Sequence, residues 1–232
     1  MKEIRDNEQV KAYLSAFRIE SVFNDQIVPH MSLYQFDPGE SICGQGDVAQ
    51  HLFVLVKGKV KIYTTSPEGK TLILSFKMPL EIIGDIEYVR DSDFINTVEA
   101  VSSVCMIGVD DHWLKKYADN DPGFLRFLLE IIARKFYIKS NSLSFNLMYP
   151  VEVRLASYIL SVSFDASDDQ FKGWLNSASL TDAANLIGTS YRHLNRVIRK
   201  LCLEGLIERK KGRILVRDRK GLSALAGRNL YE

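Results

Sequence analysis

The chain has 232 residues, of which 46% are apolar and 25% are charged, as is usual for a soluble globular protein. It has no uncharged apolar run long enough to cross a membrane, and its first residues lack the apolar core of a signal peptide. The three cysteines are scattered and form no C-x-x-C motif, so neither a disulfide framework nor a thiolate metal site is indicated. We therefore expect a protein of the reducing cytoplasm with no membrane partner.

The formal net charge of +1 hides an uneven distribution along the chain. Residues 1–150 hold 16 Lys and Arg against 20 Asp and Glu, whereas residues 151–232 hold 14 against 9. Residues 185–220 alone hold 11 basic and 3 acidic side chains. A basic end on an acidic remainder predicts that only the C-terminal third approaches a polyanion.

In chain order, the first expected elements are one or two helices within residues 3–29, where Val10, Leu14 and Phe17 recur at helical spacing. From residue 33 to residue 108, short β-rich runs alternate with turn residues. These runs are LYQF, HLFVLV, KVKIYTT and TLILSF, separated by turns such as Asp-Pro-Gly and Lys-Gly. Strands of this length and spacing predict a β-sandwich or barrel.

A long helix is expected over residues 121–149, because Asp121 can cap it and Pro122 fits its first position. One apolar stripe, with a spacing near 3.5 residues, consists of Leu125, Leu129, Ile132, Phe136, Leu143 and Leu147. A second apolar side consists of Phe127, Leu128 and Ile131. Two apolar sides are easier to bury in a dimer than in a monomer, so the stripe predicts a homodimer. The alternative is that the stripe packs on the protein's own β-rich region.

Residues 179–201 read SLTDAANLIGTSYRHLNRVIRKL and predict two short helices joined by a tight turn. Ser179 and Asp182 are typical of a helix start, Gly188 permits the positive φ of the turn, and Ser190 can cap the second helix. The apolar residues that would close a small core between the helices are Ala183, Ile187, Leu194, Val197, Ile198 and Leu201.

The opposite face of the second predicted helix is cationic and rich in hydrogen-bonding groups. It carries Tyr191, Arg192, Asn195, Arg196 and Arg199. Such a face on a helix after a glycine turn suits the major groove of DNA. Two alternatives remain, namely an ordinary solvated surface helix and a basic interaction module that contacts another protein.

After the helix pair, the run ERKKGRILVRD predicts two short strands around Lys211 and Gly212. A basic hairpin in this position usually meets DNA phosphates, although a merely solvated turn is the alternative. The side chains expected at base edges are Arg192, Asn195 and Arg196. Those expected at phosphates are Ser190, Tyr191, Arg199, Lys210, Lys211 and Arg213.

The run FDPGESICGQGDVAQHLFVLVKGKVKIY resembles the first half of a cyclic-nucleotide-binding domain, with turns at Gly39, Gly46, Asp47 and Gly58. With the long helix and the helix pair, the whole chain resembles the Crp/Fnr family of bacterial transcription regulators, and the SYRHL run resembles its YeiL-type branch. The resemblance implies an α+β fold: a β-roll (jelly-roll) sensor domain over residues 1–120, a dimerisation helix over 121–149, and a winged helix-turn-helix domain over 150–232. It also implies double-stranded DNA and RNA polymerase as partners.

The chain departs from this family where its members hold a cyclic nucleotide. Where the family has an acid for the ribose and an arginine for the cyclic phosphate, this chain has Asp85 and Phe94. An apolar ring cannot neutralise a phosphate, so cAMP and cGMP are not the expected ligands, with Arg90 as the alternative phosphate partner. A small-molecule effector, if there is one, is unidentified and is expected among Gly84, Asp85, Ile86, Phe94, Ile95, Phe136 and Lys139.

The family's usual recognition helix reads S-R-E-x-x-x-R, whereas here Arg192 replaces the acid and Arg196 is retained. Arginine prefers guanine or phosphate, so a non-standard DNA site is expected. Residues 1–30 contain no cysteine for an iron–sulfur sensor, and the four histidines are dispersed, so no metal site is expected. The chain shows no nucleophile–base pair or phosphate-binding loop, and we do not expect an enzyme.

Overall fold

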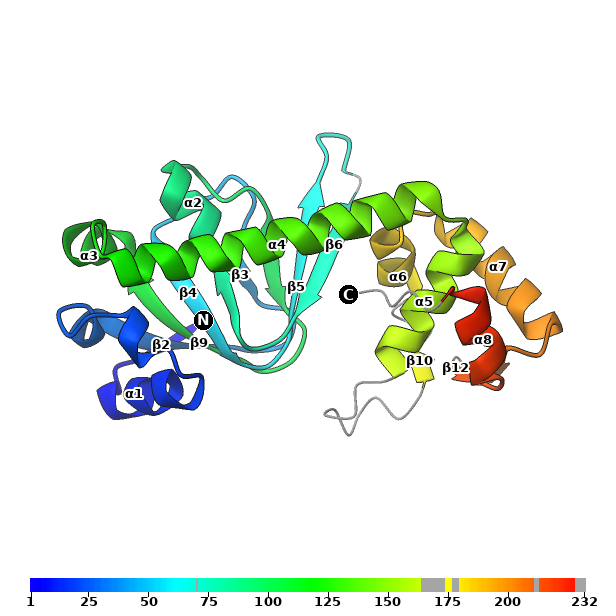
Figure 1. The fold of residues 1–232 in the computed structure, drawn as a ribbon, viewed down its shortest axis with the longest axis horizontal. Coiled ribbons are helices and arrows are strands. Elements are labelled where there is room, and N and C mark those ends of the chain that lie inside the picture. Colours follow the sequence, from blue (N-terminus) through cyan, green and yellow to red (C-terminus); the bar gives the residue numbers. More distant parts are fainter. Residues whose placement is uncertain (70, 164–173, 177–179, 211–212, 228–232) are drawn as a thin grey trace. The chain divides into compact units, whose positions relative to one another are not determined.

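The computed structural model describes residues 1–69, 71–163, 174–176, 180–210 and 213–227. The chain divides into two compact units, Met1–Lys135 and Phe136–Glu232, and the boundary lies within the long helix α4 (Pro122–Met148). The predicted α+β order is confirmed: a β-rich first part, a long helix and a helical C-terminal part (Figure 1). Within the described part of the chain, no helix is long and apolar enough to cross a membrane.

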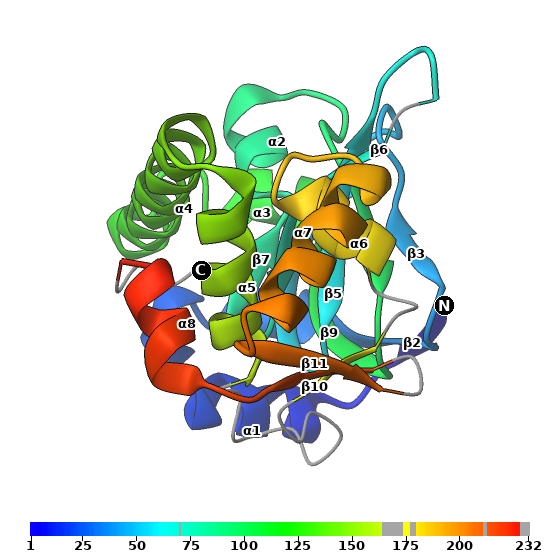
Figure 2. The same ribbon diagram turned by 90° about the vertical axis from the view of Figure 1, so that its right-hand side faces the viewer.

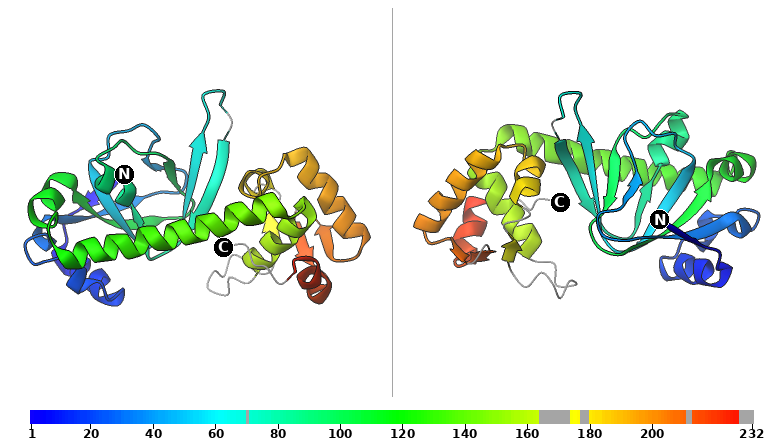
Figure 3. Two further views of the ribbon diagram at one scale, coloured as in Figure 1. Left: turned by 45° about the horizontal axis from the view of Figure 1, so that its top comes forward. Right: turned by 180° about the vertical axis from the view of Figure 1, so that it is seen from behind.

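The first unit is built on two antiparallel sheets. The five-stranded sheet has the order β1 (Lys2–Ile4), β2 (Met31–Phe36), β9 (Val104–Asp110), β4 (His51–Lys57) and β7 (Glu81–Ile83). The four-stranded sheet has the order β3 (Ser41–Cys43), β8 (Thr97–Ala100), β5 (Val60–Thr65) and β6 (Thr71–Lys77). The β5–β6 hairpin extends beyond the rest of the roll (Figure 3). The four predicted runs coincide with β2, β4, β5 and β6, which confirms the β-roll.

Strand β4 explains why its whole sequence is apolar. Phe53 and Leu55 point into the core between the two sheets. Leu52, Val54 and Val56 point to the other side, where helices cover the five-stranded sheet. Successive side chains of a strand face opposite ways, and both faces here are buried, so the usual alternation with polar residues is absent.

The helices of the first unit cover the outer face of the five-stranded sheet (Figure 1). They are α1 (Asn7–Ala16), the 3₁₀ turns η1 (Glu20–Val22) and η2 (Val28–His30), α2 (Asp85–Arg90), α3 (Asp111–Tyr117) and the start of α4. Phe124, Leu128 and Ile131 of α4 are buried there, and Phe127 is half-buried. Leu128, Ile131 and Phe127 are the second apolar side that the sequence shows, so this side packs on the protein's own sheet. Asp121 caps α4 as expected, and the amide N–H of Phe124 holds the pKa of its carboxyl below the usual range.

The beginning of the chain differs from the expectation of helix alone over residues 3–29. Residues 2–4 form β1, which pairs with β2 in the register Lys2 to Gln35 and Ile4 to Leu33. The backbone groups of β1 pair with the edge of β2, which lies some thirty residues further along the chain. Local periodicity reveals the helix that follows, α1, but carries no information about that edge.

The second unit packs a three-stranded sheet and several helices around one core. Its elements are α5 (Val151–Ser163), β10 (Trp174–Asn176), α6 (Leu180–Leu186), α7 (Tyr191–Leu203), β11 (Ile207–Lys210), β12 (Arg213–Val216) and α8 (Arg219–Leu225). The sheet order is β10-β12-β11, and β11 packs against α7 (Figure 2). The predicted hairpin around residues 211–212 is present as β11 and β12, although those two residues lie outside the described part.

Candidate nucleic-acid interface and effector site

The α6–α7 pair has the geometry that the sequence predicts. Gly188 takes φ +67 in the connecting turn, and the hydroxyl of Ser190 accepts from the His193 amide at 3.2 Å to cap α7. The predicted helix start at Ser179 lies outside the described residues, and α6 begins at Leu180. All six residues predicted for the core of the pair are buried: Ala183, Ile187, Leu194, Val197, Ile198 and Leu201.

Arg154 of α5 is a structural residue of this pair that sequence reasoning missed. It is 9% exposed, and one guanidinium nitrogen donates to the backbone carbonyl of Ile187, at the end of α6. The last carbonyls of a helix lack partners within the helix, so a cation there is well placed. Arg154 therefore holds the turn that sets the direction of α7. Its position within an apolar helix run was the only sign in the sequence that it is buried.

The outward face of α7 brings the predicted contact residues together. A surface depression is lined by Ser190, Tyr191, Arg192, His193, Asn195, Arg196 and Arg199. The aromatic ring of Tyr191, which is 48% exposed, lies on this face together with the three arginines. Guanidinium groups on one face of a helix can donate to guanine edges and to phosphates.

The β11–β12 hairpin adds further cations next to α7. Lys210 and Arg213 are exposed on it, whereas Lys211, also predicted at a phosphate, lies outside the described residues. Arg209, which sequence reasoning did not select, donates from Nη1 to Oδ1 of Asn195 at 2.8 Å. Arg217 instead forms an ion pair with Glu208. Side chains alternate between the two faces of a strand, so Arg209 shares a face with the apolar Ile207. This alternation is the sequence signal that could have placed Arg209 on the face of β11 that meets α7.

The expected effector segment begins at the β7–α2 turn. Gly84 has φ +93, and a Cβ there would lie 2.7 Å from the carbonyl oxygen of His51, so only glycine fits. Asp85 follows and is 2% exposed. Its Oδ1 accepts from Nζ of Lys135 at 2.9 Å, and the same ammonium lies 3.2 Å from Oε1 of Glu81. Asp85, the acid expected to contact a ligand, is thus already paired with Lys135 of the protein itself.

The other expected pocket residues have different surroundings. Phe94 is buried in the core between the two sheets, and Ile95 is 46% exposed, with its amide held by the Glu87 carboxylate at 3.1 Å. Ile86 is half-buried. Phe136 and Lys139 belong to the second unit, and Phe136 is 74% exposed. The residue of α4 whose ammonium contacts Asp85 is Lys135, which was not among the expected pocket residues.

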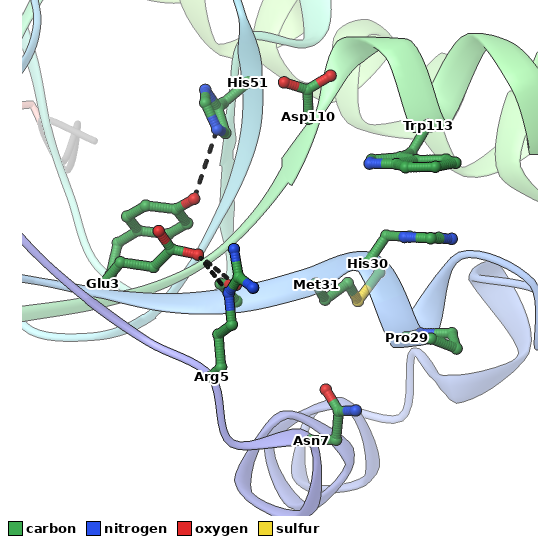
Figure 4. Close-up of a pocket in the computed structure, with 11 residues that line it drawn as sticks. Glu3, Arg5, Asn7, Pro29, His30, Met31, His51, Asp110 and Trp113 are labelled. Atoms are coloured by element: carbon green, nitrogen blue, oxygen red, sulfur yellow. Dashed lines mark hydrogen bonds and ion pairs between the residues drawn. The ribbon is translucent and has the colours of Figure 1, made fainter.

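A cavity of about 550 Å³ lies elsewhere in the first unit, between β1, β2, β4 and the start of α3 (Figure 4). Its lining mixes acidic, basic and aromatic side chains, among them Glu3, Arg5, His51 and Asp110. The rings of His30 and Trp113 stack at 3.6 Å along one wall. Among the described residues, no cluster of His, Cys, Asp and Glu could hold a metal ion.

The cysteines have the environment of core residues. Cys43 is buried, and burial raises the pKa of its thiol to about 12. Cys105 is also buried, and the same desolvation raises its pKa. A thiol that stays protonated is a poor nucleophile, so neither residue has the thiolate character of a redox sensor.

Two family models match the chain. The cyclic nucleotide-binding domain matches residues 33–120, and the Crp-like helix-turn-helix domain matches residues 153–225. These ranges coincide with the β-roll and with the unit that carries α6 and α7. Fold and site together define a regulator in which a cyclic-nucleotide-binding-type domain is joined to a helix-turn-helix.

Known proteins with this organisation align over most of the chain. The regulatory protein YeiL of Escherichia coli O157:H7 is 29% identical over 211 residues, or 89% of this chain and 93% of the relative. The CRP-like cAMP-activated global transcriptional regulator of Mycobacterium tuberculosis is 21% identical over 193 residues, which are 82% of this chain and 86% of that relative. A CRP-family transcriptional regulator from Thermus thermophilus has a TM-score of 0.70 at 22% identity, covering 86% of this chain and 98% of that structure. The chain belongs to the Crp/Fnr family of transcription regulators.

Proposed function

We propose that this protein is a homodimeric, sequence-specific DNA-binding regulator of transcription, acting in the cytoplasm and through RNA polymerase rather than by catalysis. The observation that carries this proposal is the outward face of α7, where Arg192, Arg196 and Arg199 line one depression beside Tyr191. In a two-fold dimer, two such helices would enter successive major grooves about 34 Å apart.

Within this interface, Arg192 and Arg196 are proposed to read base edges, with guanine as the preferred partner. Ser190, Tyr191 and Arg199 are proposed to meet phosphates from α7, together with Lys210, Lys211 and Arg213 from the hairpin. Asn195 was also expected at a base edge. It would have to serve there with one amide hydrogen and one lone pair, because the others bond to Tyr191 and Arg209.

The exposed stripe of α4 supports the dimer. Leu129 is 67% exposed, Phe136 74% and Leu147 77%, on a helix whose other side is buried at Leu128 and Ile131. A row of large apolar side chains left in water by a single chain is typical of an interface between subunits. The occupant proposed for this row is α4 of a second copy, which presents the same row and satisfies two-fold symmetry.

The effector, if the protein takes one, is proposed not to be a cyclic nucleotide. Phe94 offers no charge to a phosphate, and Asp85 is already paired with Lys135. The expected pocket among Gly84, Asp85, Ile86, Phe94, Ile95, Phe136 and Lys139 stays a proposal. A regulator without any ligand, active through its abundance, is the alternative.

Selection of genomic DNA fragments by the purified protein, followed by sequencing, tests the proposal directly. The expected result is enrichment of a pseudo-palindrome whose half-sites differ from the usual family half-site, with bound species of dimer mass. Repeating the selection with cell extract reports any effector. If no fragment is retarded even at low salt, the second unit is better explained as a protein-interaction module.

A further inference from the structure

Arg209 in β11 and Arg217, which directly follows β12, lie in opposite electrostatic situations. Arg217 pairs with the carboxylate of Glu208, so its charge is neutralised within the protein. Arg209 bonds at 2.8 Å to the amide oxygen of Asn195, which is neutral. Within the described residues, no carboxylate lies at ion-pair distance from Arg209. Within that part of the chain, the charge of Arg209 is therefore not neutralised by a carboxylate and can meet an anion from outside.

The pleat of β11 explains why Arg209 and not its neighbours reaches α7. Arg209 lies two residues after Ile207 and opposite Ile214, and both isoleucines are buried. It therefore shares their sheet face, which packs against α7 (Figure 2). Glu208 and Lys210 lie on the other face. Arg209 is the last residue of β11 on the face that packs against α7, and its guanidinium contacts Asn195 of α7.

Asn195 is bonded in a way that suits orientation of an arginine better than reading of a base. Its Nδ2 donates to the carbonyl of Tyr191 at 3.0 Å, one turn back in α7, while its Oδ1 accepts from Arg209. The amide that reads adenine must present both its oxygen and its nitrogen to the base edge. Here each atom already has one protein partner, which leaves only one hydrogen and one lone pair, and the two bonds fix which way the amide faces.

We infer that Arg209 is a DNA-contacting residue that binds a backbone phosphate flanking the groove entered by α7, and that Asn195 is its positioning residue rather than a base reader. The inference rests on the proposed function and assigns a partner to one further cation of the same interface. A guanidinium held at one nitrogen keeps its remaining N–H groups for phosphate oxygens. It loses less conformational freedom on binding, because the bond to Asn195 already restricts the side chain.

The test uses the full-length protein and two labelled duplexes, one enriched by the wild type from a random-sequence pool and one scrambled. Affinity is measured against salt concentration for wild type, Arg209→Ala, Arg209→Lys, Asn195→Ala and the double variant. Arg5→Ala, which removes one exposed charge from the first unit, is the matched control. Thermal unfolding checks each variant, and Arg209→Gln, which keeps a donor to Asn195 without the charge, replaces Arg209→Ala if that variant is unfolded.

Arg209→Ala is expected to weaken binding to both duplexes by the same factor and to lower the salt slope by about 0.9 for each bound protomer. Arg209→Lys and Arg5→Ala should keep the wild-type slope. Asn195→Ala should weaken both duplexes alike, and should have no further effect once Arg209 is alanine. An unchanged slope in Arg209→Ala, or loss of discrimination caused by Asn195→Ala in the Arg209→Ala background, would overturn the inference. A wild type that binds neither duplex would refute the proposed function itself, and the inference with it.

Discussion

Lys135 pairs with two buried carboxylates of the first unit. Its Nζ lies 2.6 Å from the carbonyl of Ile82, 2.9 Å from Asp85 and 3.2 Å from Glu81. Burial by itself would raise the pKa of Glu81, but the ammonium groups of Lys135 and Lys77 outweigh it, and the net shift is downward. One lysine thus contacts two nearly inaccessible carboxylates at the β7–α2 turn.

Removal of that charge is expected to be costly. Lys135→Met would leave Asp85 and Glu81 buried with only Lys77 nearby, and breaking a buried ion pair in this way destabilises a protein by roughly 3–5 kcal/mol. Urea unfolding at neutral pH measures the loss. Lys115→Met is the matched control, since that lysine pairs with Asp91 and Asp111 at the surface and should change little. Equal stability of the Lys135 variant and the wild type would contradict this assignment.

The same network predicts how stability depends on pH. The pKa of Glu81 is lower in the folded protein than its ordinary value, so its contribution is fully present above that ordinary value. The contribution is lost as the pH falls through the lowered folded-state pKa. Urea unfolding at several acidic pH values should therefore show wild-type stability declining in that window. Glu81→Gln should show a shallower decline; an equally steep one would assign the acid sensitivity to other carboxylates.

Arg196 is the residue of α7 for which the largest loss of DNA specificity is expected. Its guanidinium lines the exposed depression, and a bidentate contact to guanine contributes roughly 1–3 kcal/mol of discrimination. Arg196→Ala should therefore lose that much affinity for the selected duplex while scarcely changing on a scrambled one. Lys200→Ala, which lies outside the depression and near Glu152, serves as the control. Discrimination that survives in Arg196→Ala would refute base reading by this residue.

Among the elements, α4 has one apolar side packed on its own sheet and another that is exposed. Phe124, Leu128 and Ile131 are buried on the five-stranded sheet, while Leu129 and Phe136 stay exposed on another side. A helix with two apolar sides has more apolar surface than a single chain covers. The sequence predicted both sides, and the structure identifies which one the protein's own sheet occupies.

Leu129→Arg should dissociate the dimer. The substitution removes Leu129 from both subunits, and burying each leucine contributes roughly 1.5–3 kcal/mol to association. The dissociation constant of the dimer should therefore rise by at least about a hundredfold. Sedimentation velocity over a concentration series measures this. Glu130→Gln is the control, because Glu130 is exposed and pairs with Arg126 off the stripe. If Leu129→Arg sediments as the wild type does, the stripe is not the dimer interface.

At the scale of the whole molecule, regulation would require a ligand that favours the DNA-competent arrangement over another, because binding shifts a balance only by differential affinity. We expect no such difference in affinity for a cyclic phosphate, since Phe94 is in the core and Asp85 is paired. Isothermal titration with cAMP and cGMP should give no saturable heat, and DNA affinity should be the same with and without them. Saturable binding of either nucleotide would show that Arg90 or another cation replaces the missing arginine.

Local chemistry explains how much of this protein can be predicted from its sequence. Strand runs, the capped start of α4, the glycine turn at Gly188 and the cationic face of α7 all follow from periodicity and from residues with special backbone geometry. Such signals act over a few residues and survive in any fold. They were sufficient for the order of the parts and for the residues gathered on α7.

The tertiary structure decided the contacts between residues that are distant in sequence. Three contacts join segments that no local sequence pattern connects. They are the pairing of β1 with β2, the ion pair of Lys135 with Asp85, and the hydrogen bond from Arg154 to the turn before α7. Arg209 is the clearest example. The sequence around it marks only a basic hairpin, and its bond to Asn195 depends on which face of β11 meets α7. The sequence by itself therefore determined most of the elements, because local periodicity and turn chemistry act within a few residues, and its resemblance to a known family indicated the class of regulator. Only the fold decided which charges are neutralised and which remain exposed, because that depends on the packing of distant segments.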